Sequence, residues 1–374
     1  MGMSSDVVVI GAGIIGCACA AALSAGGLDV TIVEASTIGG GATAAGMGHL
    51  VVMDDNPAEL ALTRRSLRLW RELVAGQEAQ HEYSRCGTLW IAADEEEMAA
   101  ARTKHSVLTA HGIACELLDQ QALSEAEPAL RPGLAGGLLV QNDALVYPPK
   151  STQILLDRAL AAGAALVQGQ VTAITKNGVL CSDGRQLHAG QVIVANGLAA
   201  AALLPELPLR AKKGHLLVTD RYPGFIRHQL VELGYIKSAH ASDGDSVAFN
   251  LQPRPTGQIL IGSSRQFDTV DKAVEIAMIR KMLAHAAGFV PALAQLNVLR
   301  SWTGFRAATP DGLPLIGPHP GRENIWLAVG HEGLGITTSL ATAELLAGQI
   351  CGSPAAIPAS PYLPSRLLAP IAYA

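Results

Sequence analysis

The segment DVVVIGAGIIGCACAAALSAGGLDVTIVE, residues 6–34, decides the fold of this chain. Its β-branched residues 7–10 form a short apolar run that predicts a buried strand. The alanine-rich residues 14–25 predict a helix, which a Gly-Gly pair ends. Residues 30–33 predict a second buried strand, and Glu34 follows it directly.

Three glycines, Gly11, Gly13 and Gly16, connect the first strand to the helix at GxGxxG spacing. Glycine at these places permits a tight turn, close approach of the backbone to a pyrophosphate, and close contact between helix and strand. The helix N-terminus offers unpaired N–H groups to phosphates. Glu34 lies where an acidic side chain can accept a hydrogen bond from a ribose hydroxyl. We therefore predict a dinucleotide site rather than a merely glycine-rich turn.

The composition is that of a globular chain with a large interior. At 374 residues, with 49% hydrophobic and 16% charged residues, about two domains are expected. The net charge of −5 and the lack of a basic run argue against nucleic acid as a partner.

The cysteines predict neither a disulfide framework nor a metal site. All six are scattered, and no CxxC pair occurs, so packing roles are expected. The first strand begins almost at the N-terminus, which leaves no room for a secretory signal, and no apolar run reaches membrane-spanning length. We expect a cytoplasmic protein, with peripheral contact at the inner membrane left open.

A second glycine-rich segment, GGGATAAGMGH at residues 39–49, follows Glu34. An NAD-only domain would normally continue into another crossover helix and strand. Interior glycines each cost about 1 kcal/mol relative to alanine, so this run is not expected to form a stable helix. A flexible surface loop is one interpretation. Its place just beyond the ribose acid favours a second contact with the same long cofactor, which would be FAD rather than NAD.

The rest of the chain alternates between helical and extended patterns. Helices are predicted at 57–74, 95–111, 151–162, 272–287 and 337–350. Strands are predicted at 83–92, 136–140, 165–171, 179–181, 191–197 (ending in a small-residue turn), 247–252, 258–262 and 325–329, and residues 212–219 begin a second visit to the second domain. Alternation in 247–252 places Asn250 and Gln252 on one strand face. The Pro-rich residues 353–374 are expected to drape over the surface.

Five segments together resemble the FAD-dependent D-amino-acid oxidase superfamily over essentially the whole chain. They are VVVIGAGIIG with Glu34, GGGATAAGMGH, VIVANG, WTGFRAATPDGLPLIG and GHEGLGITTSLATAELL. Within this superfamily the chain looks most like glycine oxidase, sarcosine oxidase β subunits and bacterial D-hydroxyproline dehydrogenases, and its segment HEGLGITTSLATA is most similar to the last of these. The resemblance implies an α/β protein with a Rossmann-type FAD-binding domain (1–80, 147–211 and 298–374). This domain would be interleaved with an α+β substrate domain built on an antiparallel sheet (81–146 and 212–297).

The resemblance also assigns the cofactor contacts. The residues expected to bind FAD are Gly11, Gly13, Ile14, Ile15, Gly16, Glu34, Ala35, Gly41, Ala42, Thr43, Gly46, Met47, Gly48, Val171, Ala195, Asn196, Gly197, Gly304, Arg306, Gly333, Leu334, Gly335, Ile336 and Thr337. A helix N-terminus at Gly335 would stabilise negative charge on the reduced flavin. The cysteine that tethers flavin in monomeric sarcosine oxidases is matched by the Ala307–Ala308 neighbourhood, so FAD is expected to be non-covalent.

Four residues are the candidates for substrate binding and catalysis: Arg306, Asn250, His49 and His331. Arg306 falls where the family keeps an arginine for the substrate carboxylate, although a surface arginine is the alternative. Asn250 replaces the family's substrate-contacting tyrosine. Gly333 replaces a second arginine of glycine oxidase. Both histidines are more commonly packed or hydrogen-bonded than catalytic.

Two further residues, Tyr235 and Lys237, are expected to edge the substrate pocket or to lie on the surface. No base is strictly required, because an amine delivered neutral can donate hydride to a flavin.

We predict an FAD-dependent dehydrogenase that removes hydride from the carbon beside an amine of a cyclic or D-amino acid, cis-4-hydroxy-D-proline above all. A glycine- or sarcosine-type oxidase that releases peroxide is one alternative. Another is a flavin-binding subunit that is active only with partner subunits. A second dinucleotide fingerprint is not visible, so electrons should come from the organic substrate and leave to oxygen, a quinone or a redox protein.

Overall fold

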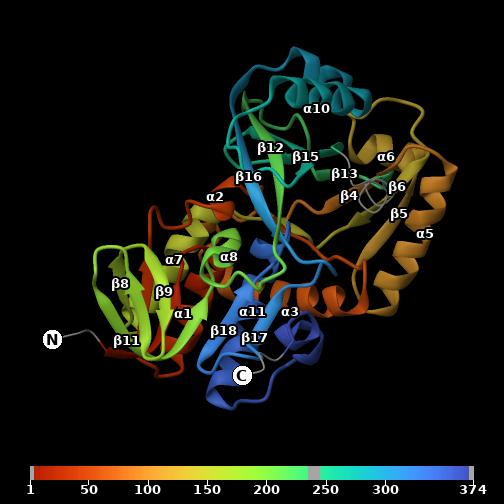
Figure 1. Cartoon of the computed structure of the whole chain (residues 1–374). Coiled ribbons are helices and arrows are strands. Elements are labelled where there is room, and N and C mark those ends of the chain that lie inside the picture. Colours follow the sequence, from red (N-terminus) through yellow and green to blue (C-terminus); the bar gives the residue numbers. More distant parts are fainter. Residues whose placement is uncertain (1–3, 235–244, 370–374) are drawn as a thin grey trace.

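The computed structural model describes residues 4–234 and 245–369 and builds them into two large sheets (Figure 1). Each sheet has eight strands, and a two-stranded ladder of β3 (His49–Leu50) and β7 (Ala144–Leu145) is separate from both. In Figure 1 the first sheet lies at the lower left and the second at the upper right. The α/β class and the Rossmann-type first unit are confirmed.

The first sheet contains the predicted dinucleotide unit, in the order β17-β18-β11-β1-β2-β8, with β10 on β11 and β9 on β10. Its strands are β1 (Ser4–Ile10), β2 (Val30–Glu34), β8 (Ala165–Gln168), β9 (Val171–Thr175), β10 (Gly178–Cys181), β11 (Gln186–Val194), β17 (Leu315–Pro318) and β18 (Ile325–Val329). β1 pairs in parallel with both β2 and β11. Parallel strands need helical crossovers, and α1 (Ile14–Ala25) supplies the first of them.

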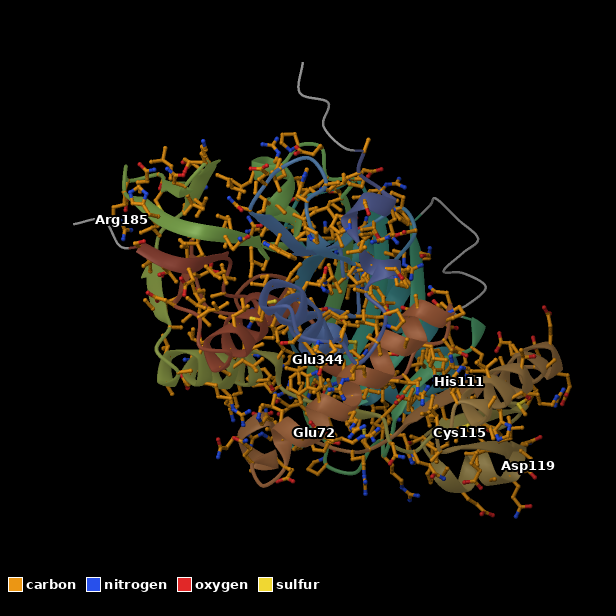
Figure 2. All side chains as sticks on the ribbon, turned by 90° about the horizontal axis from the view of Figure 1, so that it is seen from below. Glu72, His111, Cys115, Asp119, Arg185 and Glu344 are labelled. Carbon is orange, nitrogen blue, oxygen red and sulfur yellow. The ribbon has the colours of Figure 1, made fainter. Side chains whose placement is uncertain are left out.

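Helices cover the first sheet because β1 is apolar on both faces. Val7 and Val9 belong to the core that contains α1, whereas Val8 and Ile10 face the opposite core. α1 packs against α7 (Pro148–Ala161) and α11 (Gly335–Cys351), and α3 (Pro57–Val74) packs on α11. Arg65 of α3 binds Glu344 of α11 through both carboxylate oxygens; Figure 2 labels Glu344.

The second sheet has the order β16-β12-β15-β14-β13-β4-β6-β5. Its strands are β4 (Thr88–Ala92), β5 (Cys115–Asp119), β6 (Gly136–Val140), β12 (Arg210–Arg221), β13 (Gln229–Glu232), β14 (Ser246–Pro253), β15 (Gln258–Phe267) and β16 (Val298–Ala308). α10 (Ile276–Phe289) packs on β14 and β15, where Phe249 stacks on Phe289 at 4.5 Å between ring centroids. α5 (Glu95–Ala110) and α6 (Gln120–Ala126) pack on β4 to β6.

Short helices connect these elements: α2 (Ala42–Ala45), α4 (Glu78–His81), α8 (Ala200–Leu203), and the 3-10 turns η1 (Gly197–Ala199), η2 (Pro291–Gln295), η3 (Ser360–Tyr362) and η4 (Pro364–Arg366). α2 corrects the expectation that residues 39–49 hold no helix, because four residues between glycines suffice for one turn. No helix within residues 4–234 and 245–369 is both long and apolar enough to cross a membrane.

Several predicted boundaries were wrong. Residues 165–171 are two strands interrupted by Gly169, the strand predicted at 83–92 begins only at Thr88, and the helix predicted from 272 begins at 276. The C-terminal segment does not simply drape over the surface. Tyr362 is only 1% exposed, and its hydroxyl donates to the carbonyl of Ala58 at 2.6 Å. β16 pairs with β12 in the second sheet, although residues 298–374 were expected in the FAD-binding domain; the domain ranges stay a prediction.

Candidate active site

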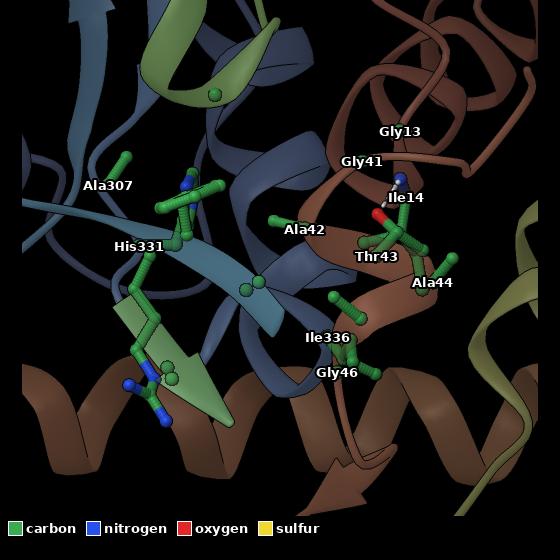
Figure 3. A pocket seen from close by; sticks show the side chains of 18 of the residues that line it. Gly13, Ile14, Gly41, Ala42, Thr43, Ala44, Gly46, Ala307, His331 and Ile336 are labelled. Carbon is green, nitrogen blue, oxygen red and sulfur yellow. Dashed lines mark hydrogen bonds between the residues drawn. The ribbon is translucent and has the colours of Figure 1, made fainter. Parts of the chain in front are cut away.

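A cavity of about 1610 Å³ runs from the carboxyl end of β1 to the second sheet. It exceeds the roughly 300–1,000 Å³ of sites for drug-sized ligands, so it suits a long cofactor together with a small substrate. The N-terminus of α1, residues 40–47, residues 300–307 of β16 and residues 330–336 line it. Figure 3 shows this wall from close by.

The turn between β1 and α1 forms one end of the cavity. Gly11 has a φ of +101°, which disfavours any side chain there. A Cβ on Gly13 would meet only the Thr43 hydroxyl, at 3.4 Å. The Ile14 N–H donates to that hydroxyl at 3.1 Å (Figure 3). Because Gly13 has no side chain, the helix N-terminus is open to a phosphate.

Glu34 stands at the end of β2 and holds this turn in shape. One carboxylate oxygen accepts from the Ala12 N–H at 2.7 Å, and the other accepts from the Ser36 N–H at 2.8 Å. A carboxylate has about four acceptor sites, so capacity remains for a ribose hydroxyl. Asn196 also lines the cavity, and its buried Oδ1 has no partner within the described chain.

Glycines allow three segments to meet in the middle of the cavity. A Cβ on Gly46 would lie 2.8 Å from Cδ1 of Ile336, and one on Gly304 would lie 2.4 Å from Cβ of Ala45. α2, β16 and the start of α11 therefore lie in contact around the place where a flavin would be held. The N-terminus of α11 points here, where its dipole stabilises negative charge.

Arg306 lies on β16 opposite Lys212 of β12. Its Nη1 donates to the carbonyl of Ser264 at 3.1 Å, and the side chain crosses β12 at Gly214, where a Cβ would be only 2.8 Å from Nη1. Arg306 forms no ion pair within residues 4–234 and 245–369, because nearby Glu332 binds Lys212 at 2.8 Å. This guanidinium is available to a substrate carboxylate, which it can bind bidentately.

Both candidate histidines line the cavity as neutral rings. Burial lowers the pKa of His49 to about 4; Gln252 opposes this shift, and the charge of Arg306 adds to it. Burial alone lowers the pKa of His331 to about 3. His331 Nε2 lies 3.0 Å from the hydroxyl of Thr342, so its ring is held by packing and one hydrogen bond.

Asn250 and Gln252 lie on the cavity side of β14 but have different roles. Asn250 lines the cavity, and its buried Oδ1 has no partner in the described structure. Gln252 is 1% exposed, and its Nε2 donates to the Met47 carbonyl at 2.7 Å. Gln252 therefore fixes the loop that carries Met47, rather than lining the cavity itself.

Three of the residues predicted to contact FAD do not line the cavity: Gly16, Gly48 and Thr337. Gly16 packs on Gly11, and Gly48 packs on the Val146 carbonyl. The Thr337 hydroxyl donates to the His49 carbonyl at 2.8 Å. The other predicted cofactor and substrate residues all line it. Tyr235 and Lys237 lie outside the described residues.

Sequence reasoning missed Gly214, Trp90, Gln229 and Glu59, which also line the cavity. Burial, with the negative charges of Asp55 and Glu332, raises the pKa of Glu59 to about 7. Gly214 stands within the strand pattern Lys-Lys-Gly-His, and a glycine in such a place can mark where another group approaches the backbone closely. This signal could have identified Gly214 from the sequence.

The six cysteines are free, and burial raises the pKa of Cys17 and Cys19 to about 12, which fits packing roles.

A Rossmann-type unit that opens into a long cavity is typical of an enzyme that binds a dinucleotide cofactor. The family model described as "FAD dependent oxidoreductase" (DAO) matches residues 6–349. The chain belongs to this family of FAD-dependent enzymes. When bound, FAD accepts the two electrons of the substrate as hydride.

Individual relatives match along nearly their full length. The chain is 28% identical to a glycine oxidase of Pseudomonas putida, covering 98% of this chain and 100% of that protein. It is also 28% identical to the hydrogen cyanide synthase subunit HcnC of Pseudomonas aeruginosa, covering 98% and 97%. The crystal structure of glycine oxidase from Geobacillus kaustophilus superposes with a TM-score of 0.86 at 26% identity, covering 96% and 98%.

Proposed function

We propose that this enzyme oxidises the C–N bond of a cyclic or D-amino acid, with cis-4-hydroxy-D-proline as the favoured substrate. The observation that carries the proposal is the Arg306 guanidinium, which lies in the cavity with no acidic partner in the described chain. Asn250 and Gly333 also line the cavity, and their small size supports a substrate that carries a ring.

Each group of the site has a part in this reaction. Arg306 binds the carboxylate and so orients the carbon beside the amine. His49 and His331, as neutral rings, add no positive charge that would repel a substrate ammonium. Met47 is 8% exposed and shields the reacting region from water. The N-terminus of α11 lines the cavity and would stabilise negative charge on a reduced cofactor bound there.

Two other functions have support of their own. The glycine oxidase relatives favour an amine oxidase that passes electrons to oxygen and releases peroxide. HcnC is named as a subunit, which favours a protein that works with partner chains. We favour a quinone or redox protein over oxygen as acceptor, with dye or quinone reduction well above peroxide formation.

We expect cis-4-hydroxy-D-proline to bleach the flavin faster than glycine, sarcosine or D-alanine do. A smaller substrate without the hydroxyl would leave the polar groups on the side of the pocket away from Arg306 without hydrogen bonds. It should therefore reduce the flavin more slowly. The measurement is stopped-flow absorbance of the holoenzyme under nitrogen. Faster bleaching by glycine would contradict the proposed substrate. Peroxide formed in proportion to substrate in air would identify an oxidase instead.

Heat or acid should release FAD into the supernatant. Ala307 and Ala308 are buried where a tethering cysteine would stand, and no cysteine lines the cavity in the described residues. Absorbance of supernatant and pellet after precipitation measures the release, with free FAD added to denatured protein as the control. Flavin that stays with the washed pellet would show a covalent bond.

A further inference from the structure

Three unpaired polar groups border a single apolar residue on the cavity side of the second sheet. Val231 of β13 pairs with Trp90 of β4 on one side and with Asn250 of β14 on the other. Gln229 is two residues before Val231 and therefore on the same face. All four residues line the cavity, and Val231 is only 6% exposed.

Each of the three polar residues carries a buried atom without a hydrogen bond in the described structure: Nε1 of Trp90, Oε1 of Gln229 and Oδ1 of Asn250. Trp90 is 3% exposed and held in place, since Lys104 Nζ lies 4.5 Å from its ring and binds Asp54. Gln229 is 2% exposed, and its Nε2 donates to the Thr88 hydroxyl at 3.1 Å. Buried polar atoms are rarely left unpaired, so these three call for a partner.

The chemistry of the three atoms selects the partner. Trp90 offers one donor, while Gln229 and Asn250 offer acceptors. An ammonium only donates and would leave the indole unpaired. A carboxylate only accepts and would leave both amide oxygens unpaired. A hydroxyl accepts from Trp90 and donates to one of the two amide oxygens, so of these three groups it alone serves both kinds of atom, and the other amide oxygen stays unpaired; the carbon that carries the hydroxyl rests on Val231.

The distance to Arg306 suits one small ring. The Arg306 guanidinium donates a hydrogen bond to the carbonyl of Ser264 on β15. Ser264 lies two residues beyond Gly262, and Gly262 pairs with Asn250 of β14. Two residues along a strand and one strand across separate these backbone positions by about 8 Å. A ring whose carboxylate binds Arg306 can therefore extend its far substituent toward Val231.

We propose that Trp90, Gln229 and Asn250 form a hydroxyl-binding subsite over Val231, which selects hydroxylated cyclic amino acids over their deoxy analogues. The inference rests on the proposed function, because it takes the substrate carboxylate to lie on Arg306. It adds Trp90 and Gln229 as specificity-determining residues of that reaction.

The test compares cis-4-hydroxy-D-proline with D-proline in holoenzyme carrying Trp90→Phe or Asn250→Leu. Trp90→Phe removes the N–H but keeps an aromatic ring. We expect the wild type to prefer the hydroxylated compound by at least about a hundredfold in kcat/KM, because the analogue leaves the subsite unpaired. Each variant should lower this ratio at least about tenfold, because the hydroxylated compound loses a hydrogen bond while D-proline no longer leaves that group unpaired. A purely structural defect would slow both compounds together.

Trp326→Phe is the matched control. Its indole N–H donates to Gln191 in the first sheet at 2.6 Å, and its loss should leave the ratio unchanged. Equal use of both compounds by the wild type, or an unchanged ratio in either subsite variant, would overturn the subsite. If neither compound bleaches the flavin, the proposed function fails. Calorimetry would then measure the affinity of the same two compounds for the same variants. The ratio of the two dissociation constants would test the subsite in place of the ratio of kcat/KM values.

Discussion

Replacing Gly16 with alanine should yield no folded, yellow protein. A Cβ at residue 16 would lie 1.9 Å from the Gly11 carbonyl oxygen and 3.1 Å from its carbonyl carbon. Both atoms are backbone, so no side-chain rotation relieves the clash. Gly11 itself has a φ of +101° and is enclosed by Asn196, so it cannot move away cheaply. Helix and strand must separate, and the phosphate-binding turn is lost with them.

Gly13→Ala is the control that separates folding from cofactor binding. Its Cβ would meet only the Thr43 hydroxyl, at 3.4 Å, so the chain should fold with a nearly unchanged melting temperature. The added methyl group would stand in front of the α1 N-terminus, where a pyrophosphate approaches, and should cost most of the FAD affinity. Flavin absorbance per chain and thermal unfolding measure both variants. A Gly16→Ala protein with wild-type flavin content and melting temperature would contradict this account.

Local patterns in the sequence were sufficient to predict the cofactor half. The unit β1-α1-β2 could be predicted because apolar runs, glycines and an acid at fixed spacing all point to one structure. Helix α1 matches its predicted bounds, 14–25, and α3 matches 57–74, where Pro57 at the start is typical of a first helical turn. Each of these signals lies within about thirty residues.

The substrate half depends on which strands pair, and sequence periodicity does not specify that. Trp90, Val231 and Asn250 are distant in the chain and become neighbours only through the register of β4, β13 and β14. Gly214 becomes meaningful only because Arg306 crosses it from β16. In the sequence alone, residue 214 is a glycine within a strand pattern, and Arg306, which crosses it, lies 92 positions further along the chain.

The adjacent lysines of β12 show the same limit. Lys212 faces the cavity and binds Glu332, whereas Lys213 is fully buried on the other face and binds Glu275 at 2.8 Å. Period-2 alternation predicts that the two point apart, but not which one faces the substrate. Only the folded sheet shows that Lys212 binds Glu332, while Arg306 on the neighbouring strand forms no ion pair within residues 4–234 and 245–369.

Arg306→Leu should lower kcat/KM for amino-acid substrates by about 2–5 kcal/mol of transition-state stabilisation, roughly 30- to 4,000-fold. The substrate carboxylate would be left without its counter-charge in a partly buried site. Arg306→Lys should recover little, because an ammonium cannot reproduce the planar fork that lies across Gly214. Steady-state kinetics with cis-4-hydroxy-D-proline under a saturating dye acceptor give both values.

The control for Arg306→Leu is Arg300→Leu on the same strand. Arg300 is exposed, lies over the Trp302 ring at 5.5 Å and lines the same cavity six residues before Arg306, so its loss removes a charge of the same kind from the cavity wall at a distance from the proposed carboxylate site. Flavin absorbance per chain is measured in both variants, because Arg306 is also an expected FAD contact and a loss of cofactor must be separated from a loss of substrate binding. A neutral carboxamide of the same amino acid offers a second check, because it has no anion to lose and its rate should fall far less in Arg306→Leu. Wild-type kinetics in Arg306→Leu, or an equal loss in Arg300→Leu, would mean that the substrate carboxylate binds elsewhere in the cavity.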